Sequence, residues 1–256
     1  MPPLSKQMRD EYTNLFSTLA IRSNKSAEVN VVVNKIKASR ERYQKVADIV
    51  KLPWYFVAIT HQLEASGNFN KHLHNGDSLN ARTIQVPKGR PKVGTPPFTW
   101  EESAMDALEW EGYKKLGNWS LSSLLYRFEM YNGFGYRKGN RIYSPYLWSY
   151  CQHYNKGKYV ADGHFDPEAI SKQCGAAVLL KALENSGEKI EAEPETSKRN
   201  LFKVPLAPST YNPDAVALQY LLNEYGYKLN PDGHAGNKTS EAVYNFSGKY
   251  LQGDNR

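Results

Sequence analysis

Two acidic residues and a threonine in the first third of the chain are of the types that cut glycosidic bonds. Glu64 ends an apolar run, whereas Asp77 and Thr83 lie in the Gly- and Asn-rich segment that follows. A carboxyl group on an apolar face tends to keep its proton, because charging it there costs desolvation energy. A carboxylate in a polar loop stays ionised. One protonated and one ionised carboxyl group are the two groups that acid/base cleavage of a glycosidic bond requires.

An apolar helix, expected from Pro53 to about Leu63, must position the first of these carboxyl groups. Its stripe of apolar and aromatic side chains leads to Glu64 at helical spacing, through Trp54, Val57, Ala58 and His61. The segment 66–68 (Ser-Gly-Asn) is expected to stop the helix. A carboxylate near this end faces the negative pole of the helix dipole, which raises its pKa further.

Helical periodicity predicts a mainly α fold around this helix, with a small β-hairpin region. Further helices are expected at 11–20, 27–51, 99–115, 121–131 and about 167–184, and the alternating run 81–87 predicts a β-like strand. The charged, proline-containing stretch 186–208 is typical of a linker. We therefore expect a first domain at 1–185 and a small helical domain at 209–256, with helices at 214–225 and 238–250.

Composition and charge narrow the class of protein. The chain has 256 residues, 40% of them apolar and 23% charged, which is ordinary for a soluble globular protein. No run approaches the ~18 apolar residues of a membrane span, and no secretory signal is visible at the start. The net charge is +7, with the excess in the first 208 residues. This positive charge suggests a polyanionic partner. The bacterial wall is favoured over nucleic acid, because no nucleic-acid motif appears in the sequence.

The two cysteines, Cys151 and Cys174, lack the C-x-x-C spacing of a zinc or redox site. Cys174 lies on a helical apolar pattern, which favours a buried free thiol. A single disulfide between the two remains an alternative.

The C-terminal segment resembles the three-helix peptidoglycan-binding domain. That family shows V-x-x-L-Q-x-x-L, then D-G-x-x-G-x-x-T, then A-V-x-x-F, and this chain carries these anchors in order over residues 215–246, with Ala215 in the place of the first valine. Asp232, Gly233 and Gly236 are expected to form a tight turn, and Thr239 to fix the following helix. The resemblance implies a wall-binding module with these four residues at its motif. The alternative is a helical tail that only packs on the first domain.

The first domain resembles bacterial and phage proteins of the lysozyme-like superfamily. Leu63-Glu64-Ala65-Ser66 is similar to the Glu-Ser signature of goose-type lysozymes and lytic transglycosylases, and 131–135 (Tyr-Asn-Gly-Phe-Gly) is similar to their Y-N-x-G segment. The resemblance implies that Glu64 is catalytic and that Asp77 and Thr83 hold the attacking water, as in phage-type lysozymes. It also implies glycan contacts, for which we single out Tyr131, Asn132, His74 and Tyr136.

These observations together predict a lysozyme-type N-acetylmuramidase that cleaves the bond between N-acetylmuramic acid and N-acetylglucosamine. We expect a monomer that needs no cofactor or metal, binds bacterial peptidoglycan, and neither binds nucleic acid nor inserts into membranes. The missing signal fits a phage endolysin acting on the host wall, or a bacterial protein exported by another route.

Three alternatives stay open at this point. A lytic transglycosylase uses the same glutamate without a second carboxylate. A metal-dependent amidase or peptidase would use His72, His74 and Asp77 as metal ligands. A non-catalytic wall-binding or virion-structural protein would bind the wall and leave it intact.

Overall fold

The computed structural model describes residues 2–112, 119–138, 142–161, 163–190 and 203–256. In these ranges the chain is mainly helical, with one small antiparallel sheet of two strands. The predicted fold class is confirmed at this level. The chain divides into two compact units, and each is described by itself. The larger unit comprises 18–115 and 131–190, and the smaller unit comprises 1–17, 116–130 and 191–256.

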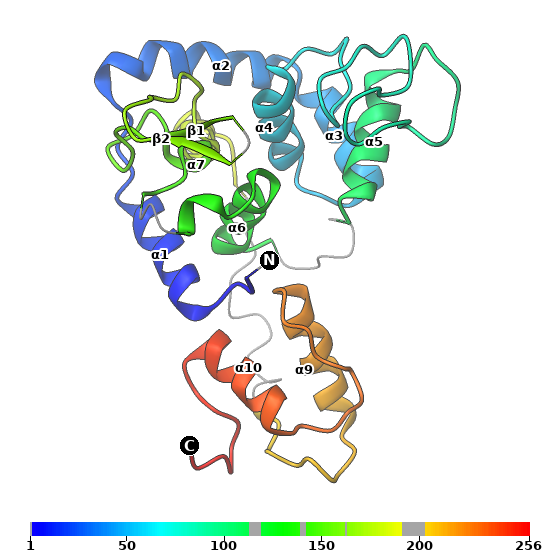
Figure 1. Ribbon diagram of the computed structural model, residues 1–256, viewed down its shortest axis with the longest axis vertical. Helices are drawn as coiled ribbons and strands as arrows, with labels where there is room; N and C mark the ends of the chain where they lie inside the picture. Colours follow the sequence, from blue (N-terminus) through cyan, green and yellow to red (C-terminus); the bar gives the residue numbers. More distant parts are fainter. Residues whose placement is uncertain (1, 113–118, 139–141, 162, 191–202) are drawn as a thin grey trace. The chain divides into compact units, whose positions relative to one another are not determined.

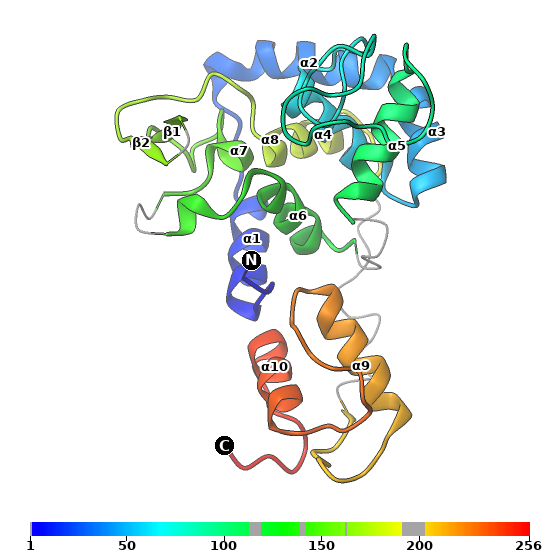
Figure 2. The same ribbon diagram turned by 45° about the vertical axis from the view of Figure 1, so that its right-hand side comes forward.

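The larger unit is built around α4 (Trp54–Ala65), which packs against α2 (Ser26–Ala38), α3 (Arg40–Val50) and α8 (Ala176–Asn185). The helix α5 (Trp100–Trp110) covers α3, and the short α7 (Pro145–Trp148) packs on α8 (Figures 1 and 2). Among the described residues of this unit, Ser23–Lys25 and Gly135–Arg137 form single-turn 3-10 helices. Every residue of α4 from Trp54 to His61 is buried, so α4 forms the centre of the core.

The helix expected over 27–51 is two helices, because the chain leaves helical geometry at Ser39 (φ −106°, ψ 12°). The buried residues of α2 end with Val33 and Ile36, and those of α3 begin with Tyr43. From Ile36 to Tyr43 is seven residues, the spacing of two helical turns. The apolar stripe therefore runs unbroken past the interruption, and hydrophobic periodicity does not reveal it.

The predicted strand at 81–87 is wrong, since this segment is an irregular loop. Ile84 and Val86 are largely exposed, at 72% and 87%, and no neighbouring strand pairs with them. The sheet lies elsewhere, where β1 (Lys158–Ala161) pairs with β2 (His164–Asp166). Tyr159 opposes Phe165 in this sheet, and their rings pack edge to face.

The last helix of the larger unit, α8, begins at Ala176 rather than near 167. The Asp166 carboxylate accepts hydrogen bonds from the backbone N–H groups of Glu168 and Ala169, which forms a turn in place of a helix start. An added Cβ at Gly175 would lie 2.2 Å from the Leu147 carbonyl oxygen. Only glycine lets the chain pass α7 at this distance, and the helix starts immediately after it.

The smaller unit contains α1 (Lys6–Ser17), most of α6 (Leu121–Asn132), α9 (Pro213–Glu224) and α10 (Asn237–Ser247). Residues 203–256 hold two helices, and α1 packs against α10 as a third. The Arg9 guanidinium lies 3.9 Å from the centre of the Phe246 ring and donates to the Phe246 carbonyl. The N-terminal helix and the C-terminal motif therefore belong to one unit. Residues 191–202 of the predicted linker lie outside the described residues.

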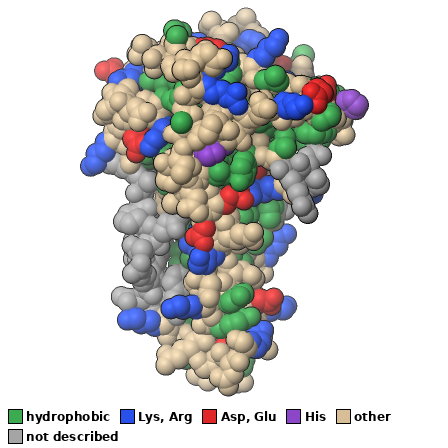
Figure 3. Space-filling view, turned by 90° about the vertical axis from the view of Figure 1, so that its left-hand side faces the viewer, with side chains coloured by type: hydrophobic (Ala, Val, Ile, Leu, Met, Phe, Trp, Pro, Cys, Tyr) green, Lys and Arg blue, Asp and Glu red, His purple; other side chains and the backbone are tan. Residues whose placement is uncertain are grey.

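Cys151 and Cys174 are buried free thiols, which was one of the two alternatives. Within the described residues, every helix is too short or too polar to cross a membrane. On the face shown in Figure 3, Lys and Arg side chains are scattered among acidic and uncharged ones.

Candidate active site

The end of α4 is fixed by side chains from two other parts of the larger unit. The helix ends at Ala65, and Ser66 adopts a left-handed conformation (φ 54°). The Lys35 ammonium of α2 donates to the Ser66 carbonyl at 2.8 Å, and the Gln173 amide donates to the Leu63 carbonyl at 2.5 Å. These contacts satisfy carbonyl groups that a helix end leaves without partners. The same two contacts fix the backbone on both sides of Glu64, which lies between Leu63 and Ser66 in the sequence.

Glu64 is half-buried, and its pKa is raised above the ordinary value of 4.5. Burial is the main cause, since the charged form loses hydration in this position. The Tyr146 hydroxyl donates to the carboxyl oxygen Oε1 at 2.7 Å and lowers the pKa in part. The negative charge of Glu111 raises it again. Burial therefore favours the protonated form of Glu64. The Tyr146 hydroxyl stabilises the ionised form by donating a hydrogen bond to it.

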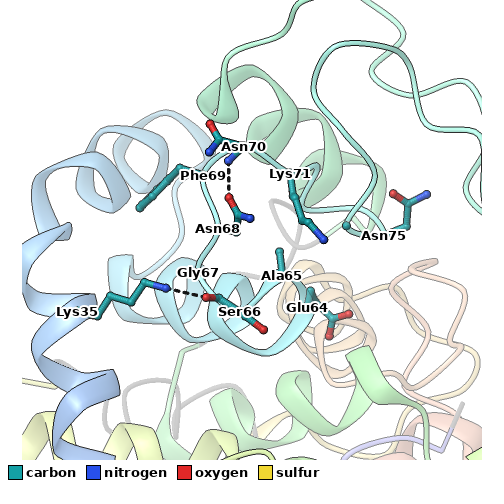
Figure 4. A pocket seen from close by; sticks show the side chains of 11 residues that line it. Lys35, Glu64, Ala65, Ser66, Gly67, Asn68, Phe69, Asn70, Lys71 and Asn75 are labelled. Carbon is teal, nitrogen blue, oxygen red and sulfur yellow. Dashed lines mark hydrogen bonds between the residues drawn. The ribbon is translucent and has the colours of Figure 1, made fainter.

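A pocket of about 670 Å³, here called the Glu64 pocket, lies at this end of α4 (Figure 4). Its wall comes from α2, the end of α4 and the following loop, and includes Lys35, Glu64, Ser66, Asn68, Lys71 and Asn75. In the view of Figure 4, Lys35 and Phe69 lie to the left of the helix end, whereas Glu64 and Asn75 lie to the right. The predicted acid therefore lines a pocket large enough for sugar units.

The loop that holds Asp77 comes against the end of α4. Gly76 lines the Glu64 pocket, and an added Cβ there would lie 3.9 Å from the Glu64 backbone oxygen. The Asp77 carboxylate accepts hydrogen bonds from the backbone N–H groups of Ile84 (2.9 Å) and Gln85 (3.2 Å), and from the Asn75 amide (3.0 Å). Burial alone would raise the pKa of Asp77, but these donors lower it below its usual range. Asp77 is thus ionised and already has donors on one oxygen.

Thr83 is buried, with 2% of its surface exposed, and its hydroxyl bonds within the loop. The hydroxyl donates to the Pro87 carbonyl and accepts from the backbone N–H of Arg90 at 2.9 Å. A second backbone hydrogen bond joins the Thr83 N–H to the Arg90 carbonyl at 2.8 Å. Thr83 therefore closes the loop from 83 to 90, and its hydroxyl is directed to protein partners.

The two histidines after α4 attach the loop to α5. His72 contacts the Ser103 hydroxyl through Nδ1 and the Ala81 carbonyl through Nε2, both at 2.8 Å. The His74 side chain is fully buried, and its Nε2 lies 2.8 Å from the Asp106 carboxylate. Burial lowers the pKa of His74. The sequence predicted that His74 contacts the substrate. In this conformation its ring cannot do so, because the ring has no exposed surface.

The segment after α6 lies beside the same loop. The Tyr131 hydroxyl donates to the Leu73 carbonyl at 3.4 Å, and Asn132 is exposed. Tyr136 is buried, and its hydroxyl accepts from the backbone N–H of Tyr159 in β1 at 3.0 Å. The structure therefore brings Tyr131 to the loop that follows Glu64, whereas Tyr136 supports the sheet.

Two residues of the site were not predicted as site residues from the sequence. Tyr146 follows Glu64 by 82 positions, and only the fold brings its hydroxyl to the carboxyl group. Glu111 follows α5 and acts on Glu64 through its charge. The residue is exposed as a whole, yet its surroundings desolvate the carboxyl group enough to raise its pKa.

In the smaller unit, the motif residues bond mainly to one another. The buried Gln219 amide donates to the Asp232 carboxylate at 3.0 Å and accepts from the backbone N–H of Gly233 at 3.0 Å. The same amide contacts the Thr239 hydroxyl at 3.3 Å, and Gly236 precedes the first residue of α10. The motif therefore stabilises the turn. Exposed aromatic surface is supplied instead by Tyr211, Tyr220 and Tyr244.

Comparison with protein families, curated proteins and solved structures finds no match for this chain. Among the described residues, no group of three or more His, Cys, Asp or Glu side chains is placed to hold a metal ion. What the arrangement can do chemically is to deliver a proton from Glu64 into the pocket and to carry a second, ionised carboxylate on the adjoining loop.

Proposed function

We propose that the chain is a peptidoglycan glycosidase with a lysozyme-like catalytic unit, acting on the bond between N-acetylmuramic acid and N-acetylglucosamine. The observation that carries this proposal is the position of Glu64, whose pKa is raised by burial, on the wall of the Glu64 pocket. A general acid must hold its proton at the working pH and reach the leaving oxygen. The raised pKa of Glu64 and its position at the end of a rigid buried helix meet both needs.

In the first step, Glu64 gives its proton to the glycosidic oxygen as the bond to the sugar breaks. The resulting carboxylate is stabilised by the hydrogen bond from Tyr146. In the hydrolase route, the ionised Asp77 takes a proton from a water molecule that attacks the opposite face of the sugar. Thr83 then acts by holding the loop on which Asp77 lies.

A lytic transglycosylase is the second candidate, and the contacts of Asp77 favour it. One Asp77 oxygen accepts three hydrogen bonds, and Asp77 does not line the Glu64 pocket. Glu64 alone would then act first as acid and afterwards as base, while a hydroxyl group of the same muramic residue closes a ring. Replacing Asp77 by Asn separates the routes, because only hydrolysis requires its carboxylate.

The smaller unit is proposed to hold the enzyme on the insoluble wall. Its motif resembles wall-binding modules, and its exposed tyrosines offer faces that stack on sugars. Attachment raises the local concentration of substrate at the catalytic unit. The basic charge of the remaining chain adds attraction to an anionic wall. Either a phage endolysin or an exported bacterial enzyme fits this arrangement.

The proposal is tested by the Glu64→Gln variant in a lysis assay on purified cell walls. We expect the loss of about 10²- to 10⁴-fold in rate that follows removal of a general acid, with wall binding unchanged. Glu41→Gln is the matched control, because Glu41 is exposed in the first turn of α3. Substantial lysis by Glu64→Gln contradicts the mechanism. Wall binding without lysis by the wild type would instead support a non-catalytic wall-binding protein.

A further inference from the structure

A second pocket adjoins the Glu64 pocket at the end of α4. It has a volume of about 390 Å³, and its lining includes Gln62, Ser66, Lys158, Lys172 and Gln173. Ser66 lines both pockets, so the two adjoin at this residue. The second pocket, here called the lysine pocket, joins the end of α4 to β1 and to the segment before α8. A polymer bound at Glu64 has this pocket as its neighbour.

Cations outnumber anions along these two pockets. Lys35 and Lys71 line the Glu64 pocket, and Lys158 and Lys172 line the lysine pocket. The acidic residues in the two linings are Glu64, whose pKa burial raises, and Glu28. Glu28 is already neutralised by Lys25 at 2.7 Å and accepts a hydrogen bond from the Tyr150 hydroxyl. The pockets thus present positive charge that the protein does not balance locally.

The ammonium groups of three of the four lysines are available to a ligand. Lys71 and Lys172 are exposed and Lys158 is half-buried. No carboxylate of a described residue forms an ion pair with any of these three side chains. Lys35, by contrast, is used at the end of α4, where it bonds to the Ser66 carbonyl. A lysine ammonium is a compact point charge that binds carboxylates and phosphates.

The lining of the lysine pocket fits a charged peptide better than a sugar. It contains no aromatic side chain that would stack on a pyranose face. Its polar groups are instead two lysines, two glutamines, two serines and Glu28, which is paired with Lys25. We propose that the lysine pocket binds the free carboxylates of the peptide stems carried by muramic residues, beside the bond that Glu64 cleaves. This inference rests on the proposed function, since it assigns the part of the same polymer that the neighbouring pocket takes.

The experiment measures binding to full-length protein carrying Glu64→Gln, so that the ligand stays intact. Two probes are used: a disaccharide of N-acetylglucosamine and N-acetylmuramic acid with its stem peptide, and an N-acetylglucosamine oligomer, which has no carboxylate. Adding Lys158→Gln and Lys172→Gln should weaken binding of the first probe about fivefold to tenfold, the scale of two solvated charge pairs. Binding of the second probe should not change. Higher salt should reduce the difference.

Two further variants make the result decisive. The pair Lys45→Gln and Lys88→Gln removes the same charge from exposed positions outside both pockets and should leave both probes unaffected. Lys158→Arg with Lys172→Arg keeps the charge and should restore most of the binding. Equal affinity of the Glu64→Gln protein with and without the Lys→Gln pair overturns the inference, as does an equal loss for both probes. If the wild type cleaves no murein, the proposed function fails, while the binding difference still decides this inference.

Discussion

The Tyr146 hydroxyl donates a 2.7 Å hydrogen bond to the Glu64 carboxyl oxygen Oε1, and this contact opposes the effect of burial on the glutamate. Burial raises the pKa of Glu64, whereas a donor to the charged form lowers it. The net effect of burial and this hydrogen bond is a raised pKa of Glu64. The raised pKa favours the protonated form of Glu64, and the Tyr146 hydroxyl is a hydrogen-bond partner for its ionised form.

Tyr146→Phe removes the donor and should raise the pKa of Glu64 further. Because the protonated form is the acid, the alkaline limb of the pH–rate profile should move to higher pH. The maximal rate should fall about tenfold or less, a smaller loss than for Glu64→Gln. Lysis rates across a pH series give both quantities. An alkaline limb that stays in place would show that Tyr146 does not act on the titration of Glu64.

Glu64→Gln should change stability in a pH-dependent way. A carboxyl group with a raised pKa in the folded state contributes stability below its ordinary pKa of 4.5, and this is lost as pH rises through the folded value. Glutamine stays neutral and still accepts from Tyr146. The variant should therefore gain melting temperature over the wild type at pH 7 and match it near pH 4. Glu41→Gln should show no such divergence.

His61 should make the protein less stable in mild acid. Its ring is fully buried, with Nδ1 3.0 Å from the Tyr43 hydroxyl, and burial lowers its pKa from 6.5 to about 4. The unfolded chain binds a proton where the folded chain does not, so stability falls as pH drops from 6.5 towards 4. The total loss is on the order of 3 kcal/mol. Denaturant unfolding should show this slope in the wild type and a flatter one in His61→Phe, with the exposed His164→Gln as control.

Asp77→Ala should loosen the loop that carries it. The change leaves the backbone N–H groups of Ile84 and Gln85 without their carboxylate acceptor. Losing these bonds should cost about 1–3 kcal/mol of unfolding free energy, reduced where water replaces the acceptor. Urea unfolding measures the loss, and hydrogen exchange should show it at 84 and 85. Unchanged exchange at both amides would mean that these bonds do not form in solution.

Gln219→Ala should destabilise the smaller unit selectively. The Gln219 side chain joins the Asp232 carboxylate and the Gly233 backbone across the turn. A buried N–H without a partner costs about 1–3 kcal/mol. We expect earlier unfolding of α9 and α10 and weaker wall binding on warming. Glu241→Gln, an exposed change on α10, is the comparison.

The sequence predicts the part of the site that depends on local pattern. The stripe on 54–61 and the turn after Ala65 are both present in the structure. In each of these, residues within one or two turns determine the geometry. The same holds for the Asp232–Gly233 turn, where the Asp232 carboxylate accepts a hydrogen bond from the backbone N–H of His234.

Long-range contacts account for what the sequence did not predict. The sequence does not indicate the break between α2 and α3 at Ser39, because the apolar spacing continues across it. The run 81–87 has an alternating pattern, yet no strand pairs with it. Tyr146 and Glu111 reach Glu64 only through packing of separate helices. The assignment of α1 to the smaller unit likewise depends on contacts such as that of Arg9 with Phe246.

The most direct test of the central claim is mass spectrometry of purified murein after digestion by the wild type and by Glu64→Gln. We predict that the wild type releases saccharide fragments ending at muramic residues, either as reducing ends or as anhydro rings, and that Glu64→Gln releases almost none. The two kinds of end distinguish hydrolysis from transglycosylation. Fragments cut in the peptide instead of the glycan, or equal release by Glu64→Gln, would contradict the account.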